Sequence, residues 1–168
     1  MRQNPEKDPL KEIPLTQGKV ALVDDEDYER LSAFNWFACF QRGRWYAMRR
    51  RGTFRGRQKN EYLHHRVLAK RVGLDVDHID RNGLDCRRSN LRYAPRWGNN
   101  ANQRKQSGTS SKFKGVTWDA GCKKWRAQIK FGGRRRYLGV FVVETLAARA
   151  YDAEAKALFG EFARLNFI

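Results

Sequence analysis

The chain has 168 residues, of which 35 are Lys or Arg and 18 are Asp or Glu, so its formal net charge is +17. This excess of positive charge favours a polyanionic partner, because the binding of a nucleic acid releases its condensed counterions. Hydrophobic residues make up 40% of the chain, with five Trp and ten Phe, which argues for packed cores and against a disordered chain. The length suits one domain or two small ones.

The sequence argues against several other classes of protein. No apolar run approaches the roughly 20 residues that a membrane-spanning helix requires, and the polar N-terminus has no signal-peptide core. The three cysteines are far apart and form no Cys-x-x-Cys pair, which argues against a zinc knuckle and a disulfide framework; they are Cys39, Cys86 and Cys122. We therefore expect a soluble, cytoplasmic protein with reduced thiols.

The first third of the chain predicts a β-rich region with one short helix. Residues 1–12 are polar and are expected to be flexible, residues 19–23 form a strand, and residues 24–31 form a helix with acids in its first turn. Residues 36–40 and 44–49 are two strands joined by a turn at 42–43. The basic stretch 49–57 is either a solvated hairpin tip or a loop that contacts phosphate.

Residues 63–72 are expected to form a strand end that turns into a helix, and they contain the sequence His64-His65-Arg66. Neighbouring residues on a helix do not face each other, so this pattern argues against a pair of metal ligands. We expect a supporting role, in which His65 or Arg66 holds a phosphate or braces a nearby site.

The segment that follows carries the chemistry. Asp77-His78, Asn90 and Asn99 lie where a short strand, a loop and the start of a helix bring an acid, a base and an amide together. The acid and the amide supply oxygen ligands, which suit a hard divalent cation. A neutral imidazole beside that cation can take a proton from water. A metal and a base next to a phosphate are the minimum equipment of a phosphodiester nuclease.

These residues resemble the HNH endonucleases, specifically the one-metal ββα-metal variant that is common in phage and mobile-element proteins. The resemblance implies that His78 is the general base and that Asp77 and Asn99 hold one Mg²⁺ or Mn²⁺ ion. It implies that Asn90, counted with His78 in the catalytic set, clamps the loop. The spacings of 12 residues from His78 to Asn90 and 9 from Asn90 to Asn99 suit this pattern, with Asn at the third position. The neighbouring Asp80 and Asp85 are expected to form turns.

Three positions depart from the HNH pattern without removing a ligand or the base. Cys86 stands where the family usually has Asn, and Pro95 stands where it often has Thr. Gly98 precedes the expected ligand Asn99, where a polar helix former is common, and a glycine there would loosen the helix and the metal site.

Residues 101–111 are small and polar and are expected to be a linker. Beyond them, residues 115–118, 124–130 and 136–141 are predicted strands, with turns at 119–121 and 132–133. Residues 144–159 are a predicted helix with a stop at Gly160, and its apolar positions at helical spacing are Leu146, Ala150, Tyr151 and Leu158. One helix packed on a three-stranded sheet leaves the other face of the sheet free.

The free face is expected to be basic, because residues 122–137 contain seven basic residues and no acid. Along the middle strand, Trp125, Ala127 and Ile129 alternate with Lys124, Arg126, Gln128 and Lys130. The segment from about Ser111 to Phe167 resembles the AP2 DNA-binding domain, and the resemblance is carried by Gly115, Val116, Trp125, Ala127, Ile129, Leu138, Gly139, Phe141, Ala147, Ala148, Ala150, Tyr151, Asp152, Leu165, Asn166 and Phe167.

In the AP2 family the sheet lies in the major groove of DNA. The resemblance therefore implies DNA contacts, and with the basic residues of this segment it gives the candidates Lys114, Trp118, Lys124, Arg126, Lys130, Arg134 and Arg136. Arg66 of the nuclease domain is a further candidate, as a phosphate contact. Trp118 and Trp125 are equally compatible with a place in the core. Thr117 replaces an Arg that plant members use for DNA, and Val142-Val143 replaces the usual polar start of the helix, so the base specificity of those members does not carry over.

The sequence thus predicts an α+β protein with a flexible start (1–12), an HNH nuclease domain with a β-rich lead-in (13–100), a linker (101–111) and an AP2-like DNA-binding domain (112–168). The expected function is metal-dependent endonuclease activity on double-stranded DNA, by a phage-encoded, homing-type enzyme in a bacterial cytoplasm. A monomer would nick one strand, and a weak dimer could break both. The main alternative is a non-catalytic AP2-type regulator with an inactive HNH remnant, and a third is an RNA-binding protein.

Overall fold

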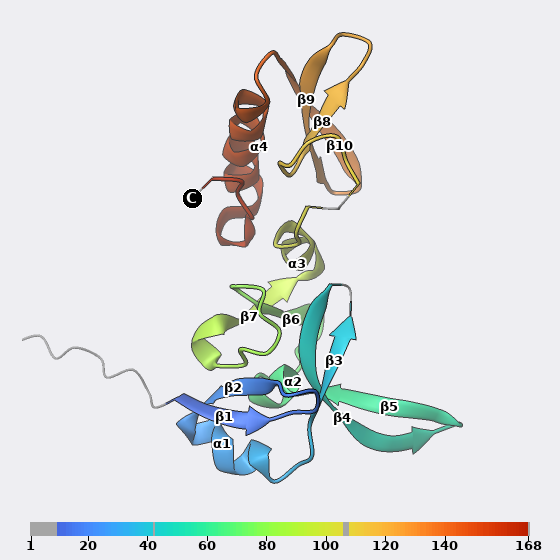
Figure 1. Ribbon diagram of the computed structural model, residues 1–168, viewed down its shortest axis with the longest axis vertical. Helices are drawn as coiled ribbons and strands as arrows, with labels where there is room; N and C mark the ends of the chain where they lie inside the picture. Colours follow the sequence, from blue (N-terminus) through green and yellow to red (C-terminus); the bar gives the residue numbers. More distant parts are fainter. Residues whose placement is uncertain (1–9, 42, 106–107, 168) are drawn as a thin grey trace, which may run out of the picture. The chain divides into compact units, whose positions relative to one another are not determined.

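The computed structural model describes residues 10–41, 43–105 and 108–167, and their ribbon is drawn in Figure 1. The described chain divides into two compact units, one up to Tyr93 and one from Ala94 onward. The predicted mixture of helices with small sheets is confirmed, and the individual elements show why each forms where it does.

The first unit begins with a hairpin and a helix. Strands β1 (Leu10–Pro14) and β2 (Val20–Asp24) pair antiparallel, and α1 (Asp25–Ser32) follows directly. The helix starts with three acidic residues, which interact favourably with its positive N-terminal end. The expected flexible start was wrong for residues 10–12, because Leu10–Pro14 pairs with β2; residues 1–9 lie outside the described residues.

A second antiparallel sheet has the order β3-β4-β5, from β3 (Phe37–Gln41), β4 (Arg44–Phe54) and β5 (Arg57–Tyr62). The predicted turn at 42–43 includes Arg42, which lies outside the described residues. The predicted basic loop 49–57 is wrong in its extent, because β4 continues to Phe54. The turn is confined to Arg55 and Gly56, which both have positive φ, as a tight hairpin turn requires. The ion pair of Arg49 with Glu61 joins β4 to β5 (2.6 Å).

The predicted motif region follows as α2 (His64–Val67), β6 (Leu74–His78), the 3₁₀ turn η1 (Arg88–Asn90) and β7 (Leu91–Pro95). Strands β6 and β7 form a two-stranded sheet. The loop between them is tied to β2, because the Leu22 backbone N–H donates to the Leu84 carbonyl and the Leu22 carbonyl accepts from Cys86 N–H, both at 2.8 Å. The core joins these elements through Ile13, Ala21, Val23, Leu31, Trp36, Ala47, Leu63, Val67, Val76, Cys86 and Leu91.

The second unit contains α3 (Arg96–Ala101), β8 (Val116–Asp119), β9 (Lys124–Phe131), β10 (Arg134–Phe141), α4 (Glu144–Phe159) and η2 (Gly160–Phe162). The three strands form an antiparallel sheet in the order β10-β9-β8, and α4 lies along one face of it (Figure 1). The predicted strands, turns and helix are confirmed here. The predicted stop is also confirmed, because Gly160 has a φ of 52° at the C-cap.

The buried face of α4 is made largely of small residues. Ala147, Ala148 and Ala155 are buried, with Tyr151 and Phe159 supplying the bulk. The expectation for Leu146 was wrong, because it is 51% exposed. The helix lies close to the sheet through its alanines, and Leu146 falls outside that stripe.

Helix α3 packs within the second unit. The Trp97 ring contacts the rings of Phe131, Phe159 and Phe162, with centroids 5.5–6.4 Å apart. Gly98 lies against Phe162, and a Cβ at this position would come within 2.9 Å of that ring. Gly98 thus permits a close contact, whereas the sequence suggested a loosened helix. The division between the units accordingly precedes α3, ahead of the predicted linker at 101–111.

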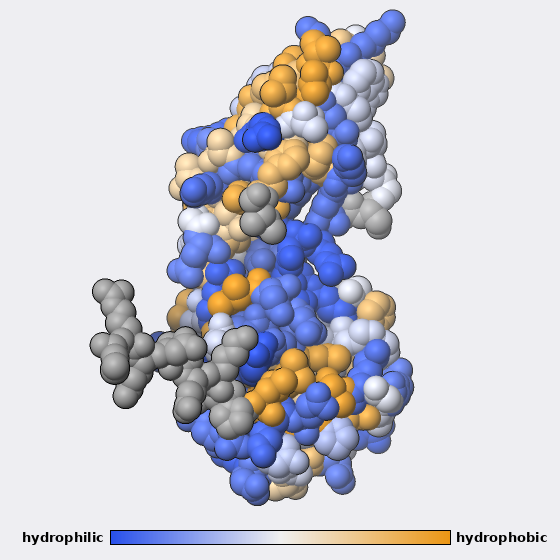
Figure 2. Space-filling model, turned by 60° about the vertical axis from the view of Figure 1, so that its left-hand side comes forward, coloured by the Kyte–Doolittle hydropathy of each residue, from blue (hydrophilic) through white to orange (hydrophobic). Residues whose placement is uncertain are grey.

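Figure 2 shows hydrophilic side chains over much of the visible face, interrupted by separate hydrophobic patches. Within the described residues, no helix combines the length and apolarity needed to cross a membrane.

Candidate active site and nucleic-acid face

Asp77 and His78 end strand β6 and are both buried, at 3% and 4% exposure. The Asp77 carboxylate accepts a hydrogen bond from Arg92 Nη2 on the paired strand β7 (3.1 Å), and both side chains are largely shielded from water. A buried carboxylate requires such a partner, because an isolated charge in the interior is costly. The strand pair thus holds a buried carboxylate at the residue before His78.

His78 is a neutral base in these surroundings. Burial lowers the pKa of its imidazole to about 4, although Asp80 and Asp85 act in the opposite direction. At neutral pH the ring therefore carries one N–H and one lone pair, and it can accept a proton. Its ring centroid lies 6.0 Å from that of Tyr46 and 4.8 Å from that of His64.

Asn90 joins the two ends of the loop that follows His78. Its side-chain amide Nδ2 donates to Asp80 Oδ1 (2.8 Å) and to the Asp85 carbonyl (2.9 Å), while its Oδ1 accepts from Asp80 N–H (3.0 Å). Its backbone carbonyl accepts from Ile79 N–H (2.8 Å). This is the geometry that a loop clamp requires.

Asp80 and Asp85 are engaged within the same loop. Asp80 Oδ1 accepts from Asn82 N–H (2.7 Å), and Asp85 forms a two-pronged ion pair with Arg87 (2.8 and 2.5 Å). Gly83 fits the loop against β4, because a Cβ there would lie 2.4 Å from the Trp45 carbonyl. The two carboxylates therefore stabilise the loop through these contacts, which agrees with the turn-forming role expected of them.

The other predicted residues of the nuclease site lie on short helices. Asn99 is half-buried on α3, within the second unit. Arg66 lies on α2 in the first unit, where its backbone carbonyl accepts from Arg30 Nη1 (2.8 Å). The Nε of Arg66 is buried and has no hydrogen-bond partner among the described residues.

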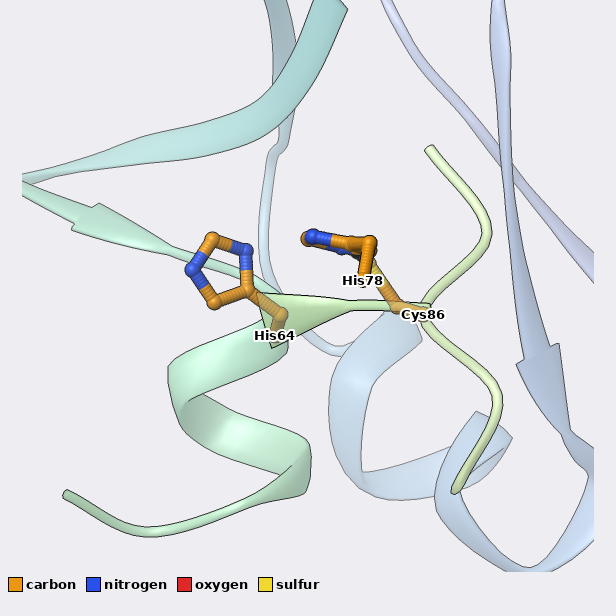
Figure 3. Close-up of side chains that lie close together, drawn as sticks. All are labelled: His64, His78 and Cys86. Carbon is orange, nitrogen blue, oxygen red and sulfur yellow. Dashed lines mark hydrogen bonds between the residues drawn. The ribbon is translucent and has the colours of Figure 1, made fainter. Parts of the chain in front are cut away.

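The structure also brings together a group that the sequence reasoning missed. The side chains of His64, His78 and Cys86 are buried and point toward one another (Figure 3), and their potential ligating atoms all lie within 4.8 Å of one another. The sequence feature that could have indicated this cluster was Cys86, which departs from the HNH pattern. Nothing in the spacing showed that α2 would carry His64 to the same place.

In the second unit, one face of the sheet is basic. Alternation along β9 places Lys124, Arg126 and Lys130 opposite the buried Ala127 and Ile129. The register places Arg135 beside Lys130, because directly opposed residues of antiparallel strands share a face. Arg126 forms an ion pair with Asp119 on β8.

Three of the predicted DNA contacts lie on the other face, where α4 packs. Arg136 is opposite Ile129 and Arg134 is opposite Phe131, and Trp118 is opposite Trp125. Arg136 forms an ion pair with Glu154 of α4. The rings of Trp118 and Trp125 contact each other at 5.0 Å.

The last predicted contact, Lys114, is tied to the backbone of its own unit. Its Nζ donates to the carbonyls of Ala101 and Gln103. A groove of about 820 Å³ adjoins it, and its lining includes Lys130, Arg135 and Arg96. Two cations of the basic face, Lys130 and Arg135, thus line the same groove as Arg96 and Lys114.

Comparison with known proteins gives a family match for part of the chain. Residues 61–101 match the family model described as HNH endonuclease. The chain is 33% identical over 113 residues to an uncharacterised HNH endonuclease, L560, of Acanthamoeba polyphaga mimivirus, which covers 66% of this chain and 58% of that protein.

Two plant proteins give shorter matches. The chain is 50% identical over 46 residues to dehydration-responsive element-binding protein 2A of Arabidopsis thaliana, and 51% identical over 45 residues to protein 2C. These matches cover 26% of this chain and 14% and 13% of the plant proteins. No solved structure matches the chain. The matched segment contains α2, β6, β7 and α3, and residues 61–101 are therefore an HNH endonuclease domain.

Proposed function

We propose that this protein is a metal-dependent endonuclease that hydrolyses phosphodiester bonds in double-stranded DNA. The observation that carries the proposal is the buried Asp77-His78 pair at the end of β6, with a neutral imidazole, inside the segment that matches the HNH endonuclease family. Like the mimiviral relative, the protein would be a viral or mobile-element nuclease, here of the homing type that the sequence resemblance suggests.

His78 is the proposed general base. A neutral ring with a lone pair takes the proton of the attacking water, so that hydroxide character develops as the water approaches phosphorus. The lowered pKa of His78 keeps this lone pair available well below neutral pH. Asn90, through its bonds to both ends of the loop 80–85, would hold the strand end that presents His78.

Asp77 and Asn99 are the proposed ligands of one Mg²⁺ or Mn²⁺ ion. Their donor atoms are a carboxylate and an amide oxygen, which are the ligands that such hard cations prefer. Arg92 forms an ion pair with the Asp77 carboxylate in the interior, which offsets part of the cost of burying an anionic donor there. The role of Asn99 is supported by its spacing and by its place within the matched segment. The bound ion would supply charge stabilisation at the scissile phosphate.

The proposed DNA-binding surface is the basic face of the second unit. Lys124, Arg126, Lys130 and Arg135 share this face, and neutralising phosphates there would release counterions. The plant relatives are named for binding a responsive element, which supports an AP2-like DNA-binding role for this unit.

The experiment is a cleavage assay on supercoiled plasmid with Mg²⁺ or Mn²⁺, with EDTA as the control and with mapping of the product ends. One site should convert supercoiled plasmid to the nicked circle, and EDTA should stop the reaction. Binding of duplex DNA without cleavage under every metal condition would replace this proposal with that of a non-catalytic DNA-binding regulator.

A further inference from the structure

The cluster of His64, His78 and Cys86 has a composition that the proposed magnesium site lacks. Its potential ligands are two imidazole nitrogens and a sulfur, whereas Asp77 and Asn99 offer oxygens. Borderline cations such as Zn²⁺ favour nitrogen and sulfur, and Mg²⁺ favours oxygen. The two sets of residues would therefore select different ions.

The geometry of the cluster is close to that of a tetrahedral zinc site. Zn–N and Zn–S bonds of about 2.0 and 2.3 Å place tetrahedral ligands about 3.3–3.6 Å apart. Here Cys86 Sγ lies 3.9 Å from His78 Nε2, and the three ligating atoms all lie within 4.8 Å of one another. Side-chain shifts of roughly 1 Å or less would bring them to bonding distance.

The His64 ring has a buried nitrogen that a bound cation would satisfy. His64 is 6% exposed, and its buried Nδ1 has no hydrogen-bond partner among the described residues. A buried polar atom without a partner is costly, and a bound cation would remove that cost. Figure 3 shows a nitrogen of the His64 ring directed toward His78. Burial also lowers the pKa of His64, so the ring is neutral and has a lone pair to donate.

We propose that His64, His78 and Cys86 form a second cation site, specific for Zn²⁺ over Mg²⁺, with a fourth position left for water. Cys86 binds as the thiolate and its proton leaves to solvent, so binding exchanges one proton for one metal–sulfur bond.

Occupation of this site would switch off the nuclease, a consequence that rests on the proposed function. A neutral imidazole has one lone pair, and a cation on Nε2 uses it. The proton of the ring is then on Nδ1, and His78 can accept no proton from water at either nitrogen. Zn²⁺ would thus act as an inhibitor through the same residue that serves as the base.

The binding test uses the whole protein and Co²⁺ as a spectroscopic substitute for Zn²⁺. A thiolate-to-cobalt charge-transfer band and intense tetrahedral d–d bands are expected, at one equivalent, and Zn²⁺ but not excess Mg²⁺ should abolish them. Cys86→Ser and Cys86→Ala should remove the charge-transfer band, and His64→Gln should weaken Co²⁺ and Zn²⁺ binding by at least roughly 10- to 100-fold, the loss that even supporting residues of metal sites cause.

The matched control is Cys122→Ser, which changes an exposed cysteine of the second unit and should leave the spectrum unaltered. Circular dichroism and thermal melting of each variant establish that it is folded. Persistence of the charge-transfer band in folded Cys86→Ser, or its loss in Cys122→Ser, would overturn the site.

The inhibition test compares cleavage with and without micromolar Zn²⁺ at saturating Mg²⁺, as a ratio within each variant. The wild type and Cys122→Ser should be inhibited, and Cys86→Ser and His64→Gln should resist. Spectroscopic binding without inhibition would refute the regulatory consequence. Spectroscopic binding by a protein that cleaves no DNA under any metal condition would support the zinc site while refuting the proposed function.

Discussion

The Arg92 guanidinium on β7 lies 3.1 Å from the Asp77 carboxylate on β6, and both side chains are largely removed from water. This pair joins the two strands on which the candidate site is built. It also means that a change at Asp77 affects stability as well as metal binding, because removing one partner leaves the other buried without compensation.

We therefore expect Asp77→Asn to abolish cleavage and to destabilise the first unit by about 3 kcal/mol. The double variant Asp77→Asn with Arg92→Gln should recover much of that stability, since neither buried charge remains, but no activity. Denaturant unfolding and plasmid nicking measure the two effects separately. Asp80→Asn is the control, and an Asp80 variant less active than the Asp77 variant would contradict the ligand assignment.

His78→Ala should reduce the rate of cleavage by about 10² to 10⁴, the range that general-base catalysis typically contributes. Duplex binding should remain, because the proposed phosphate contacts lie in the second unit. Single-turnover cleavage and binding titrations on one DNA substrate test both statements. A variant that nicks plasmid at the wild-type rate would show that His78 is not the base.

The stability of the first unit should fall on acidification. The pKa of His78 is about 4 in the folded chain and near 6.5 when unfolded, so below pH 6.5 the unfolded state binds the proton that the folded state excludes. The contribution of His78 to stability is complete above pH 6.5 and is lost progressively down to pH 4. The loss is about 3 kcal/mol for a shift of this size. Urea unfolding at several pH values measures it, and His78→Phe should flatten the profile.

Much of the second unit could be predicted because local signals agree there. Alternation along β9, glycines at the turns and an alanine-rich helix fix the elements. The faces of β10 could not be predicted, since Arg134-Arg135-Arg136 contains no apolar alternation and the strand has a register shift between Tyr137 and Gly139. Only pairing with β9 shows that Arg135 lies on the basic face.

In the first unit, the order of the motif residues along the chain could be predicted. Which other side chains lie next to them in the fold could not. Asp77-His78 and Asn90 are separated by a loop, and the turn-forming residues of that loop can be recognised in the sequence. The approach of His64 to Cys86, 22 residues later, depends on how α2 packs in the common core. The length of β4 could not be predicted either, because pairing with β5 continues the strand through Gly52, and glycine is depleted in strands.

Gly115 is expected to be essential for the second unit. Its φ is 77°, and a Cβ would lie 1.9 Å from a Tyr151 ring carbon, so Gly115→Ala meets both backbone strain and a clash in the core. A loss of about 2–4 kcal/mol is expected from the sum of these effects. Gly133→Ala is the matched control, since its φ is 78° and a Cβ at that position would meet no atom within 4 Å. It should cost only about 1 kcal/mol. Equal melting temperatures of the two variants would contradict this account.

The last prediction separates the two faces of the C-terminal sheet. Lys124, Lys130 and Arg135 share the basic face, whereas Arg134 and Arg136 lie on the side of α4. We expect Lys124→Ala, Lys130→Ala and Arg135→Ala together to weaken duplex binding uniformly across sequences. Each lost phosphate contact should reduce the slope of log affinity against log salt by about 0.9.

The control is the pair Arg134→Ala and Arg136→Ala, which removes positive charge from β10, on either side of Arg135 and on the other face of the sheet. It should change the slope little. Substitutions are preferable to truncation after residue 106, because α3 packs against Phe131, Phe159 and Phe162 and would lose those partners. Binding titrations at several salt concentrations give both slopes. If the slope of log affinity against log salt fell more in the Arg134 and Arg136 variant than in the basic-face variant, the DNA would lie on the opposite side of the sheet.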